Sequence, residues 1–373
     1  MSSGLKIALL ANLKANAPQS ALEAGDRWSE LDSERTVEAI AAALEQAGHR
    51  VTFLEGDISL CHRLKSGDFD IAFNLCEGHH GDARESHVPA ILEMLGMPYT
   101  GSKVLCLALT LDKPMAKRVL AFHGLPTPPF QVFEDPEAAV DPVLSYPLFA
   151  KPVGEGTGMG ITGDSVVRNE GELRRQLRWL IETYRQPALV EHYVEGREIT
   201  VGLLGNDQPY VLPPLEVDFS TCPAEDRGVY TSSIKSQFYD LPRYWCPAPL
   251  SQEQAEEVCR LAVASFRALD CLDVARVDFR LDAHDLEKPY ILEVNPLPGL
   301  SPGISDLVMQ AEAASIGYGE LINSILGAAL ERYPELGTRL MPESARARGR
   351  QQGVARSGVY RDGTPAATAV RGD

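Results

Sequence analysis

Two short polar patterns in the second half of the chain carry the residue types that phosphoryl transfer needs. The first is Arg276-Val277-Asp278 and the second is Glu293-Val294-Asn295. Each pattern lies in a predicted strand, where alternate side chains share a face. If the two strands are neighbours, the oxygens of Asp278, Glu293 and Asn295 come together. Such hard oxygen ligands suit Mg²⁺ shared with substrate phosphates.

Arg276 adds a positive charge to this set, where it would stabilise a phosphoryl group in transfer. A solvated sheet face with an internal ion pair is the alternative, because polar alternation alone fits that too. Both strands carry the pattern, however, and Pro296-Leu-Pro298-Gly299 follows the second one directly. These two facts favour the phosphate and metal interpretation.

A run of glycines is the second candidate feature, at Lys151-Pro-Val-Gly154-Glu-Gly156-Thr157-Gly158-Met-Gly160-Ile161. Glycines let backbone N–H groups approach phosphate oxygens closely. The run is no Walker A motif, because no Gly-Lys-Ser/Thr ends it. Ile161-Thr162 is typical of a returning strand, which argues against a dinucleotide-binding turn. We expect a flexible hairpin loop over a triphosphate, and a plain glycine-rich turn is the alternative.

Residues 5–330 resemble the ATP-grasp superfamily and, within it, the D-alanine–D-alanine ligase family. Six anchors occur in the family's order and at compatible spacing, which argues strongly against chance similarity. The anchors are Pro98-Tyr-Thr-Gly101-Ser102, Asp112-Lys113 with Lys117 and Gly124-Leu-Pro-Thr-Pro128, Ala150-Lys151-Pro152 with the glycine run, Glu191-His-Tyr-Val194-Glu-Gly-Arg-Glu198, Arg276-Val-Asp278, and Leu292-Glu293-Val-Asn295-Pro-Leu-Pro298-Gly299-Leu-Ser301.

The resemblance implies an α/β (α+β) chain with the ATP-grasp fold in three lobes. These are an N-terminal Rossmann-like parallel sheet, a small central β-rich lobe and a C-terminal mixed-sheet lobe. We expect them at residues 1–102, 103–190 and 191–338, followed by a disordered tail at 339–373. ATP would lie between the second and third lobes.

The resemblance also implies a role for each matched residue in ATP and metal binding. Lysines would neutralise the phosphates, Glu191 would accept a hydrogen bond from the adenine amino group, Val194 would meet the ring through its backbone, and Glu198 would hold the ribose. The expected ATP-binding residues are Lys113, Lys151, Gly156, Thr157, Gly158, Glu191, Val194 and Glu198. Two Mg²⁺ ions, with Mn²⁺ as a substitute, would be held by Asp278, Glu293 and Asn295.

The expected catalytic residues are Arg276, Glu30, Lys235 and Thr157, and the expected substrate contacts are Glu30, Glu77, Gly299 and Ser305. In the family's chemistry a carboxylate attacks the γ-phosphate of ATP, giving an acyl phosphate and ADP. An amine then attacks the acyl carbon and phosphate leaves. The partners would be small amino-acid or peptide substrates, and the family also has homodimeric members.

Departures from the family's motifs cluster around the amino-acid substrates. The family's N-terminal G-G-x-S-x-E is absent, so Glu30 or Glu34 would hold the substrate ammonium, and we favour Glu30. Glu77 stands where the family has His. Ile234-Lys235-Ser236 lacks the family's Tyr, and Ser305 would receive a substrate carboxylate in a changed register. We therefore expect an ATP-dependent carboxylate–amine ligase whose substrates are not two D-alanines.

Other functions remain open. The chain could be a nucleotide-binding module without ligase activity, an ester-forming ligase that uses a hydroxyl acceptor, or a true D-alanine–D-alanine ligase. The histidines His79, His80 and His87 suggest a transition-metal site, but their irregular spacing disfavours it.

The elements that must position these residues follow from hydrophobic periodicity. Strands at 5–10, 51–54 and 69–74 alternate with helices at 33–48 and 88–95, which predicts a parallel sheet. Further on we expect helices at 113–123, 172–184, 252–269 and 318–332. Strands are expected at 146–152, 189–194, 198–204, 274–281 and 290–294, with a loop at 218–237.

Charge and composition limit the partners. The 373 residues carry a formal charge of −17, which argues against a general binder of nucleic acid or of anionic membranes. Residues 342–373 hold six arginines against three acids, so the remainder carries −20. That acidic body leaves room for a local basic pocket that binds one small anion.

The seven cysteines are scattered and form no C-x-x-C pair, which fits reduced thiols. The start of the chain has no signal-peptide pattern, and no apolar stretch of about 18 residues occurs. We therefore expect a cytoplasmic protein.

Overall fold

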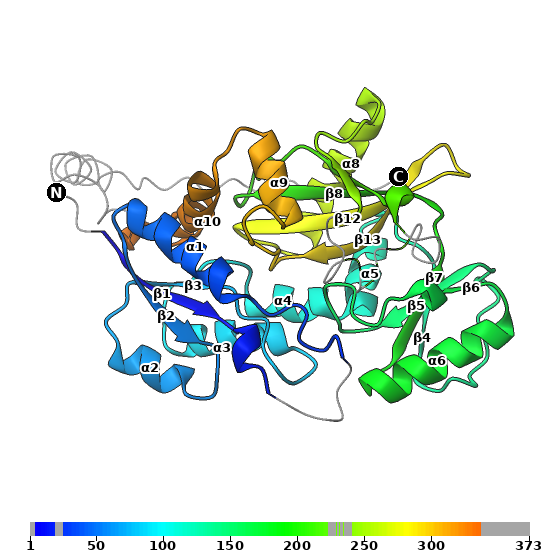
Figure 1. The fold of residues 1–373 in the computed structure, drawn as a ribbon, viewed down its shortest axis with the longest axis horizontal. Helices are drawn as coiled ribbons and strands as arrows, with labels where there is room; N and C mark the ends of the chain where they lie inside the picture. The colour runs from blue at the N-terminus through cyan, green and yellow to red at the C-terminus, as the bar shows by residue number, and fades with distance from the viewer. Residues whose placement is uncertain are drawn as a thin grey trace, which may run out of the picture.

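The computed structural model describes residues 4–18, 25–222 and 241–336, together with Val229, Thr231 and Ile234. Within these residues the chain forms three sheets with helices packed on them (Figure 1). The expected catalytic Lys235 and the expected tail at 339–373 lie outside the described residues. No helix in the described part is both long and apolar enough to span a membrane.

The N-terminal sheet is parallel, with the order β2 (Arg50–Glu55), β1 (Lys6–Ala11) and β3 (Ile71–Asn74). The central strand β1 is covered on both faces, which explains its unbroken apolar sequence. α1 (Glu34–Gln46) connects β1 to β2 and begins where the Ser33 hydroxyl accepts a hydrogen bond from the Thr36 N–H. The predicted parallel β-α-β arrangement is confirmed.

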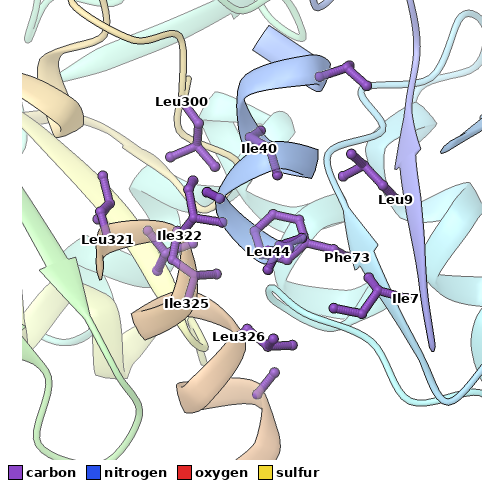
Figure 2. Close-up of a cluster of buried hydrophobic side chains, with 14 of the residues drawn as sticks. Ile7, Leu9, Ile40, Leu44, Phe73, Leu300, Leu321, Ile322, Ile325 and Leu326 are labelled. Atoms are coloured by element: carbon purple, nitrogen blue, oxygen red, sulfur yellow. The ribbon is translucent and has the colours of Figure 1, made fainter. Parts of the chain in front are cut away.

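The two faces of this sheet pack against different helices. Ala8 and Leu10 of β1 face α2 (Leu60–Ser66) and α3 (His87–Met94). Ile7 and Leu9 point to the opposite face, where α1 and α10 (Tyr318–Arg332) lie. Figure 2 shows this cluster, in which side chains of α1 and α10 interdigitate beside Phe73. The last described helix therefore packs on the first sheet of the chain.

The central sheet is antiparallel, with the order β4 (Phe130–Phe133), β7 (Ala188–His192), β5 (Leu148–Pro152) and β6 (Val166–Val167). α6 (Glu170–Tyr184) packs on it through Leu173, Leu177 and Leu180. β5 and β6 form the expected hairpin around the glycine run. The returning strand begins at Val166, however, and not at Ile161-Thr162, because Thr162 caps a 3₁₀ turn at Gly163–Ser165.

The C-terminal sheet has the order β11 (Arg243–Trp245), β10 (Leu215–Asp218), β8 (Gly196–Leu204), β12 (Val274–Asp282) and β13 (Lys288–Asn295), with β9 (Tyr210–Val211) paired to β8. We expected a mixed sheet, which is wrong for the described strands: every pairing is antiparallel. The reason is that β8–β9 and β12–β13 are joined by short turns, which reverse the chain direction.

Helices cover both faces of the C-terminal sheet. α8 (Gln252–Ala268), α4 (Val104–Leu111) and α5 (Lys113–Phe122) pack on one face. α9 (Asp306–Ala313) lies on the other, close to β8 (Figure 1). Gly202 permits this approach, since a Cβ there would lie 2.5 Å from Leu307 Cδ1. This packing fixes the position of the sheet whose strands β12 and β13 carry the polar patterns.

Candidate functional site

The two polar patterns lie side by side on neighbouring strands. In the register of β12 and β13, Arg276 is opposite Asn295 and Asp278 is opposite Glu293. A β-bulge follows directly between Asp278 and Phe279. The expected neighbouring position of the two strands is thus confirmed.

Arg276 is held in place by carboxylates. Its Nε and Nη2 donate to the two oxygens of Asp278, both at 2.9 Å, and its Nη1 lies 3.4 Å from Asp306 Oδ2 at the start of α9. Burial alone would lower the pKa of Arg276, but Asp278 and Asp306 outweigh it and raise that pKa. Thr200 Oγ1 donates to Asp278 Oδ1 at 2.6 Å. The guanidinium is therefore permanently charged and oriented by both sides of the site.

Two cavities meet at these strands. The first lies between the central sheet and the C-terminal sheet; of the expected residues it is lined by Lys113, Lys151, Gly158, Glu191, Val194, Glu198, Asp278 and Glu293. The second lies beside it; of the expected residues it is lined by Glu30, Glu77, Lys113, Gly156, Thr157, Arg276, Glu293, Asn295, Gly299 and Ser305. Lys113 and Glu293 line both cavities, so the two spaces adjoin at these side chains.

Glu191 and Lys151 form a polar part of the wall of the first cavity, and Lys117 pairs with the same carboxylate. Glu191 Oε1 lies 2.7 Å from Lys151 Nζ, and its Oε2 lies 2.7 Å from Lys117 Nζ. Burial acts to raise the pKa of Glu191, but the two ammonium groups prevail and lower it. Burial lowers the pKa of Lys117 to about 8, whereas the neighbouring acids raise that of Lys151. The wall therefore carries charge where an anion or a polar ring edge could contact it.

The far end of the first cavity is organised by a residue that the sequence reasoning missed. Arg280 Nη2 donates to Glu198 Oε2 at 2.7 Å, and its Nη1 donates to the Gly196 carbonyl at 3.1 Å. Arg280 follows Asp278 by two positions on β12, so strand alternation was a signal for it. The rings of Phe149 and Tyr193 also line this cavity and stack at 6.2 Å between centroids.

The glycine run is fastened by contacts from distant parts of the chain. Glu155 is buried, and its carboxylate accepts hydrogen bonds from Arg27 (3.1 Å), Arg84 (3.3 Å) and Gln186 (2.7 Å). Lys113 Nζ donates to the carbonyl oxygen of Glu155. The contacts of Glu155 could not be predicted from a local motif, because its partners come from segments far away in sequence.

Asp26 makes a second fastening. It accepts hydrogen bonds from the Gly160 N–H at 3.0 Å and from the Tyr184 hydroxyl at 2.8 Å. Thr157 and Gly158, between these two anchors, both have positive φ (50° and 73°). The loop is therefore tied at both ends, and its centre takes a conformation that favours glycine.

The second cavity is strongly acidic. Glu30 lies in its wall, and its Oε1 accepts from Arg84 Nε at 3.0 Å and from Nη2 at 2.8 Å. Glu34, the other candidate, is an exposed residue in the first turn of α1. Glu77 and Glu85 line the same cavity, and sequence reasoning had not singled out Glu85. Burial raises the pKa of both, that of Glu85 to about 8.

The turn after β13 also lines the second cavity. The Ser305 hydroxyl accepts a hydrogen bond from the Ser301 N–H at 2.9 Å, immediately before α9. Gly299 packs so tightly against it that a Cβ would lie 2.9 Å from Ser305 Oγ. This turn places Ser305 and Asp306 on the wall that also carries Arg276.

The three histidines, whose irregular spacing disfavours a metal site, do not meet as a group in the described part of the chain. His79 and His80 pack against Trp28 with ring centroids 5.6 and 6.3 Å away, and His87 is exposed at the start of α3. Among the described residues no three His, Cys, Asp or Glu side chains gather closely enough to hold a metal ion by themselves.

Comparisons with known proteins give one consistent result. The family model "D-ala D-ala ligase C-terminus" matches residues 119–327. A D-alanine–D-alanine ligase of Pelotomaculum thermopropionicum is 32% identical over 318 residues, covering 82% of this chain and 95% of the relative. The uncharacterized protein y4sG of Sinorhizobium fredii is 37% identical over 307 residues, covering 80% of this chain and 88% of that protein.

The fold has a solved counterpart. A crystal structure of D-alanine–D-alanine ligase from Bacillus anthracis, complexed with ATP, superposes with a TM-score of 0.68. It covers 89% of this chain and 99% of that one at 24% sequence identity. The arrangement of three sheets described above is therefore that of a known fold.

Proposed function

Because the chain belongs to the D-alanine–D-alanine ligase family of ATP-dependent ligases, we propose that it joins the carboxylate of one amino acid or peptide to the amine of another, and that its substrates are not two D-alanines. The observation that carries this proposal is the junction of the two cavities at Lys113 and Glu293. A nucleotide in the first cavity would present its terminal phosphate to a substrate in the second.

The first cavity offers the groups that ATP requires. Lys113 and Lys151 are placed to neutralise phosphates, with backbone N–H groups of Gly156, Thr157 and Gly158 nearby. At the other end of the cavity, the Glu191 side chain and the Val194 backbone would contact the adenine. The Glu198 side chain would bind the ribose. Gly156 and Thr157 line the second cavity, so we expect them at the terminal phosphate rather than deeper in the first.

The donor set at the strand pair fits Mg²⁺. The ion is commonly held by one or two carboxylates together with substrate phosphates, and Asp278 and Glu293 supply two carboxylates with the Asn295 amide beside them. Two ions, either Mg²⁺ or Mn²⁺, would be held by these three residues with the phosphates. When bound, they would neutralise charge on the β- and γ-phosphates and help to orient them.

In the first step a substrate carboxylate oxygen attacks the γ-phosphorus, the bond to the β,γ-bridging oxygen breaks, and ADP leaves. Arg276 is oriented by Asp278 and Asp306 and would stabilise the charge on the transferred group. In the second step the amine nitrogen attacks the acyl carbon, phosphate leaves, and the nitrogen loses a proton. The protein's part is to position the reactants and to neutralise charge.

The second cavity supports the altered-substrate part of the proposal. Glu77 takes the place of the family's His, and Glu85 and Asp306 add two further carboxylates to the wall. Glu30, which Arg84 holds in place, would orient a substrate ammonium, and Ser305 beside Gly299 would receive a substrate carboxylate. Thr157 would lie between the terminal phosphate and that substrate.

The test is a screen for ADP and phosphate release with single and paired amino acids and dipeptides, with products identified by mass spectrometry. Turnover that requires two different substrates, or a substrate other than D-alanine, supports the proposal. Strong conversion of D-alanine alone to its dipeptide contradicts the altered-substrate part. An ester product, or ATP binding without phosphate release for any acceptor, contradicts amide formation.

Asn295→Ala tests the metal assignment. We expect Mg²⁺-dependent phosphate release to fall by at least about tenfold, since a lost ligand costs at least as much as a lost second-shell partner. Added Mn²⁺ should restore part of it. Asn16→Ala changes an exposed residue that is far from Asn295 in the sequence. It serves as the control and should leave turnover unchanged. Unchanged turnover of Asn295→Ala would remove this residue from the metal site.

A further inference from the structure

The second cavity contains carboxylates that the proposed reaction does not use. Glu85 is only 8% exposed, lines the cavity, and receives no hydrogen bond and no ion pair within 4 Å from any residue that the structure describes. Glu77 lines the same wall and is equally without such a partner among the described residues. An acid this deeply buried is nearly always paired in proteins.

The cationic side chains around this wall are engaged elsewhere. Arg84 gives its donors to Glu30, Glu155 and the Gly154 carbonyl. Lys113 donates to the Glu155 carbonyl and lies 3.6 Å from Glu293. The remaining cation on the wall, Arg276, is held by Asp278 and Asp306. Among the described residues, therefore, no cation forms a close ion pair with Glu77 or Glu85, although Arg84 acts on both carboxyl groups from a longer distance.

The pKa values of both carboxyl groups are raised. Burial is the main cause of the raised pKa of Glu85, and Glu30 adds to it. For Glu77 burial again comes first, followed by repulsion from Glu85 and Glu30. The two acids thus lie within electrostatic reach of each other, and ionising either of them costs energy that a cation beside it would offset.

An ordinary amino acid does not balance this wall. Of the two substrates, the acyl donor brings one ammonium, which needs a single acidic partner, and the acceptor amine must be uncharged to attack the acyl carbon. Five carboxylates line the cavity (Glu30, Glu77, Glu85, Glu293 and Asp306), against the cations Lys113 and Arg276. Arg84 pairs with Glu30, Arg276 pairs with Asp306, and the metal ions would take Glu293, which leaves Glu77 and Glu85, at least one acid more than a single α-ammonium requires.

We propose that one substrate carries a second cationic group, the side-chain ammonium or guanidinium of a basic amino acid, and that Glu85 binds this group with Glu77 beside it. This inference rests on the proposed function only in taking the second cavity as the amino-acid site. It adds the class of the substrate, which neither the family nor the relatives determine.

The experiment compares basic amino acids with neutral isosteres of equal length, in both enantiomers. Lysine is paired with norleucine, ornithine with norvaline, and arginine with citrulline. Calorimetry measures their binding to protein loaded with Mg²⁺ and a non-hydrolysable ATP analogue, and phosphate release measures kcat/KM. We expect at least one basic compound to bind about tenfold or more tightly than its isostere, since a buried charged hydrogen bond has that value.

Glu85→Gln and Glu77→Gln identify the group responsible. Glu85→Gln should remove most of the preference for the basic compound while the affinity for the ATP analogue stays the same, which also shows that the variant is folded. Glu38→Gln, on the exposed face of α1, is the matched control and should retain the preference. Glu77→Gln should weaken it less than Glu85→Gln.

The outcomes separate this inference from the proposed function. Tight, Glu85-dependent binding of a basic amino acid without any phosphate release would keep the cation site and contradict the ligase reaction. Turnover with neutral amino acids only, or equal binding of basic compounds and isosteres, would overturn the cation site and leave the ligase intact. A uniform loss for every substrate in Glu85→Gln would also overturn it.

Discussion

The site buries two carboxyl groups, those of Glu191 and Glu85, in different electrostatic surroundings. Glu191 is buried between Lys117 and Lys151, so its charge is compensated within the protein. Glu85 is buried without a close ion pair among the residues that the structure describes, so ionising its carboxyl group is unfavourable. The lowered pKa of Glu191 and the raised pKa of Glu85 express this difference.

Glu85→Gln should stabilise the free protein at alkaline pH. The pKa of Glu85 rises from 4.5 to about 8 on folding, so between these values the folded state holds a proton that the unfolded state has lost. Stability from this group is complete below pH 4.5 and is lost as the pH rises towards 8. Glutamine has no such loss, so the variant should gain about 1–3 kcal/mol over the wild type at pH 8.

Thermal unfolding at pH 5, 6, 7 and 8 checks this, with the gain of Glu85→Gln increasing at each step. The groups that act on Glu85 are Glu30, Glu77, Arg84, Lys113 and Glu293. Glu38→Gln should show no such trend. A gain in Glu85→Gln that is constant with pH would mean that this carboxyl is ionised in the folded protein throughout.

The residue types that carry chemistry could be predicted where they lie on regular strands. Arg276, Asp278, Glu293 and Asn295 alternate along β12 and β13, so their shared face follows from strand geometry. Glu155 and Arg84 could not be found in this way. Their hydrogen bond joins residues 71 positions apart, and no local pattern encodes such a contact.

At the level of elements, residues 25–30 form a segment that contacts the glycine loop. Asp26, Arg27 and Glu30 reach from the N-terminal part of the chain to Gly160, to Glu155 and, through Arg84, to Gly154. This segment stands where the family's own N-terminal motif is absent. The loop that would cover the phosphates is therefore held by a segment whose sequence departs from the family.

Asp26→Asn should loosen this loop. Replacing the carboxylate removes the charge from the hydrogen bonds with the Gly160 N–H and the Tyr184 hydroxyl. We expect KM for ATP to rise about threefold to tenfold, the equivalent of one weakened charged hydrogen bond, with a smaller change in kcat. Hydrogen exchange of residues 154–163 should become faster. Glu38→Gln is again the control, and an unchanged KM would show that the fastening has no role in ATP binding.

Long amphipathic elements were predicted well, and short or uniformly apolar ones were not. The helix expected at 318–332 matches α10, and 33–48 matches α1 apart from its ends. α4 (Val104–Leu111) was missed because it is apolar at almost every position, and no side chain caps its start. α9 was missed for a related reason, since its eight residues make only about two helical turns and follow a proline- and glycine-rich stretch too closely to show a period.

At the level of the whole molecule, the end of the described chain joins parts that are distant in sequence. α10 packs on α1 over the N-terminal sheet (Figure 2). Arg332, in its last turn, donates to the Tyr99 carbonyl at 2.8 Å and pairs with Asp273 at 2.6 Å, just before β12. Gly101 N donates to the same Asp273 at 2.7 Å. One buried ion pair thus connects the end of the first sheet region to the strand that carries Arg276.

Arg332→Met should therefore destabilise the protein in a pH-dependent way. Burial raises the pKa of Asp273 from 3.8 to about 6 although Arg332 acts to lower it. Without the guanidinium this pKa rises further, and a buried carboxylate is left unpaired at pH 8. Breaking such a pair costs about 3–5 kcal/mol. Asp273 takes up a proton as the pH falls through about 6, and in the variant at a higher pH still, so the deficit should shrink as the pH falls.

Calorimetric unfolding of Arg332→Met at pH 5 and pH 8 tests this connection. Adding Asp273→Asn to the variant should recover part of the loss at pH 8, because it removes the unpaired charge but keeps the acceptor for Gly101 N–H. Arg260→Met is the control: its pair with Glu257 is on the surface, with the Arg260 side chain 62% exposed, and should contribute less than about 1 kcal/mol. A deficit of equal size at both pH values would show that Arg332 stabilises the protein through its carbonyl contacts, and that Asp273 needs no countercharge.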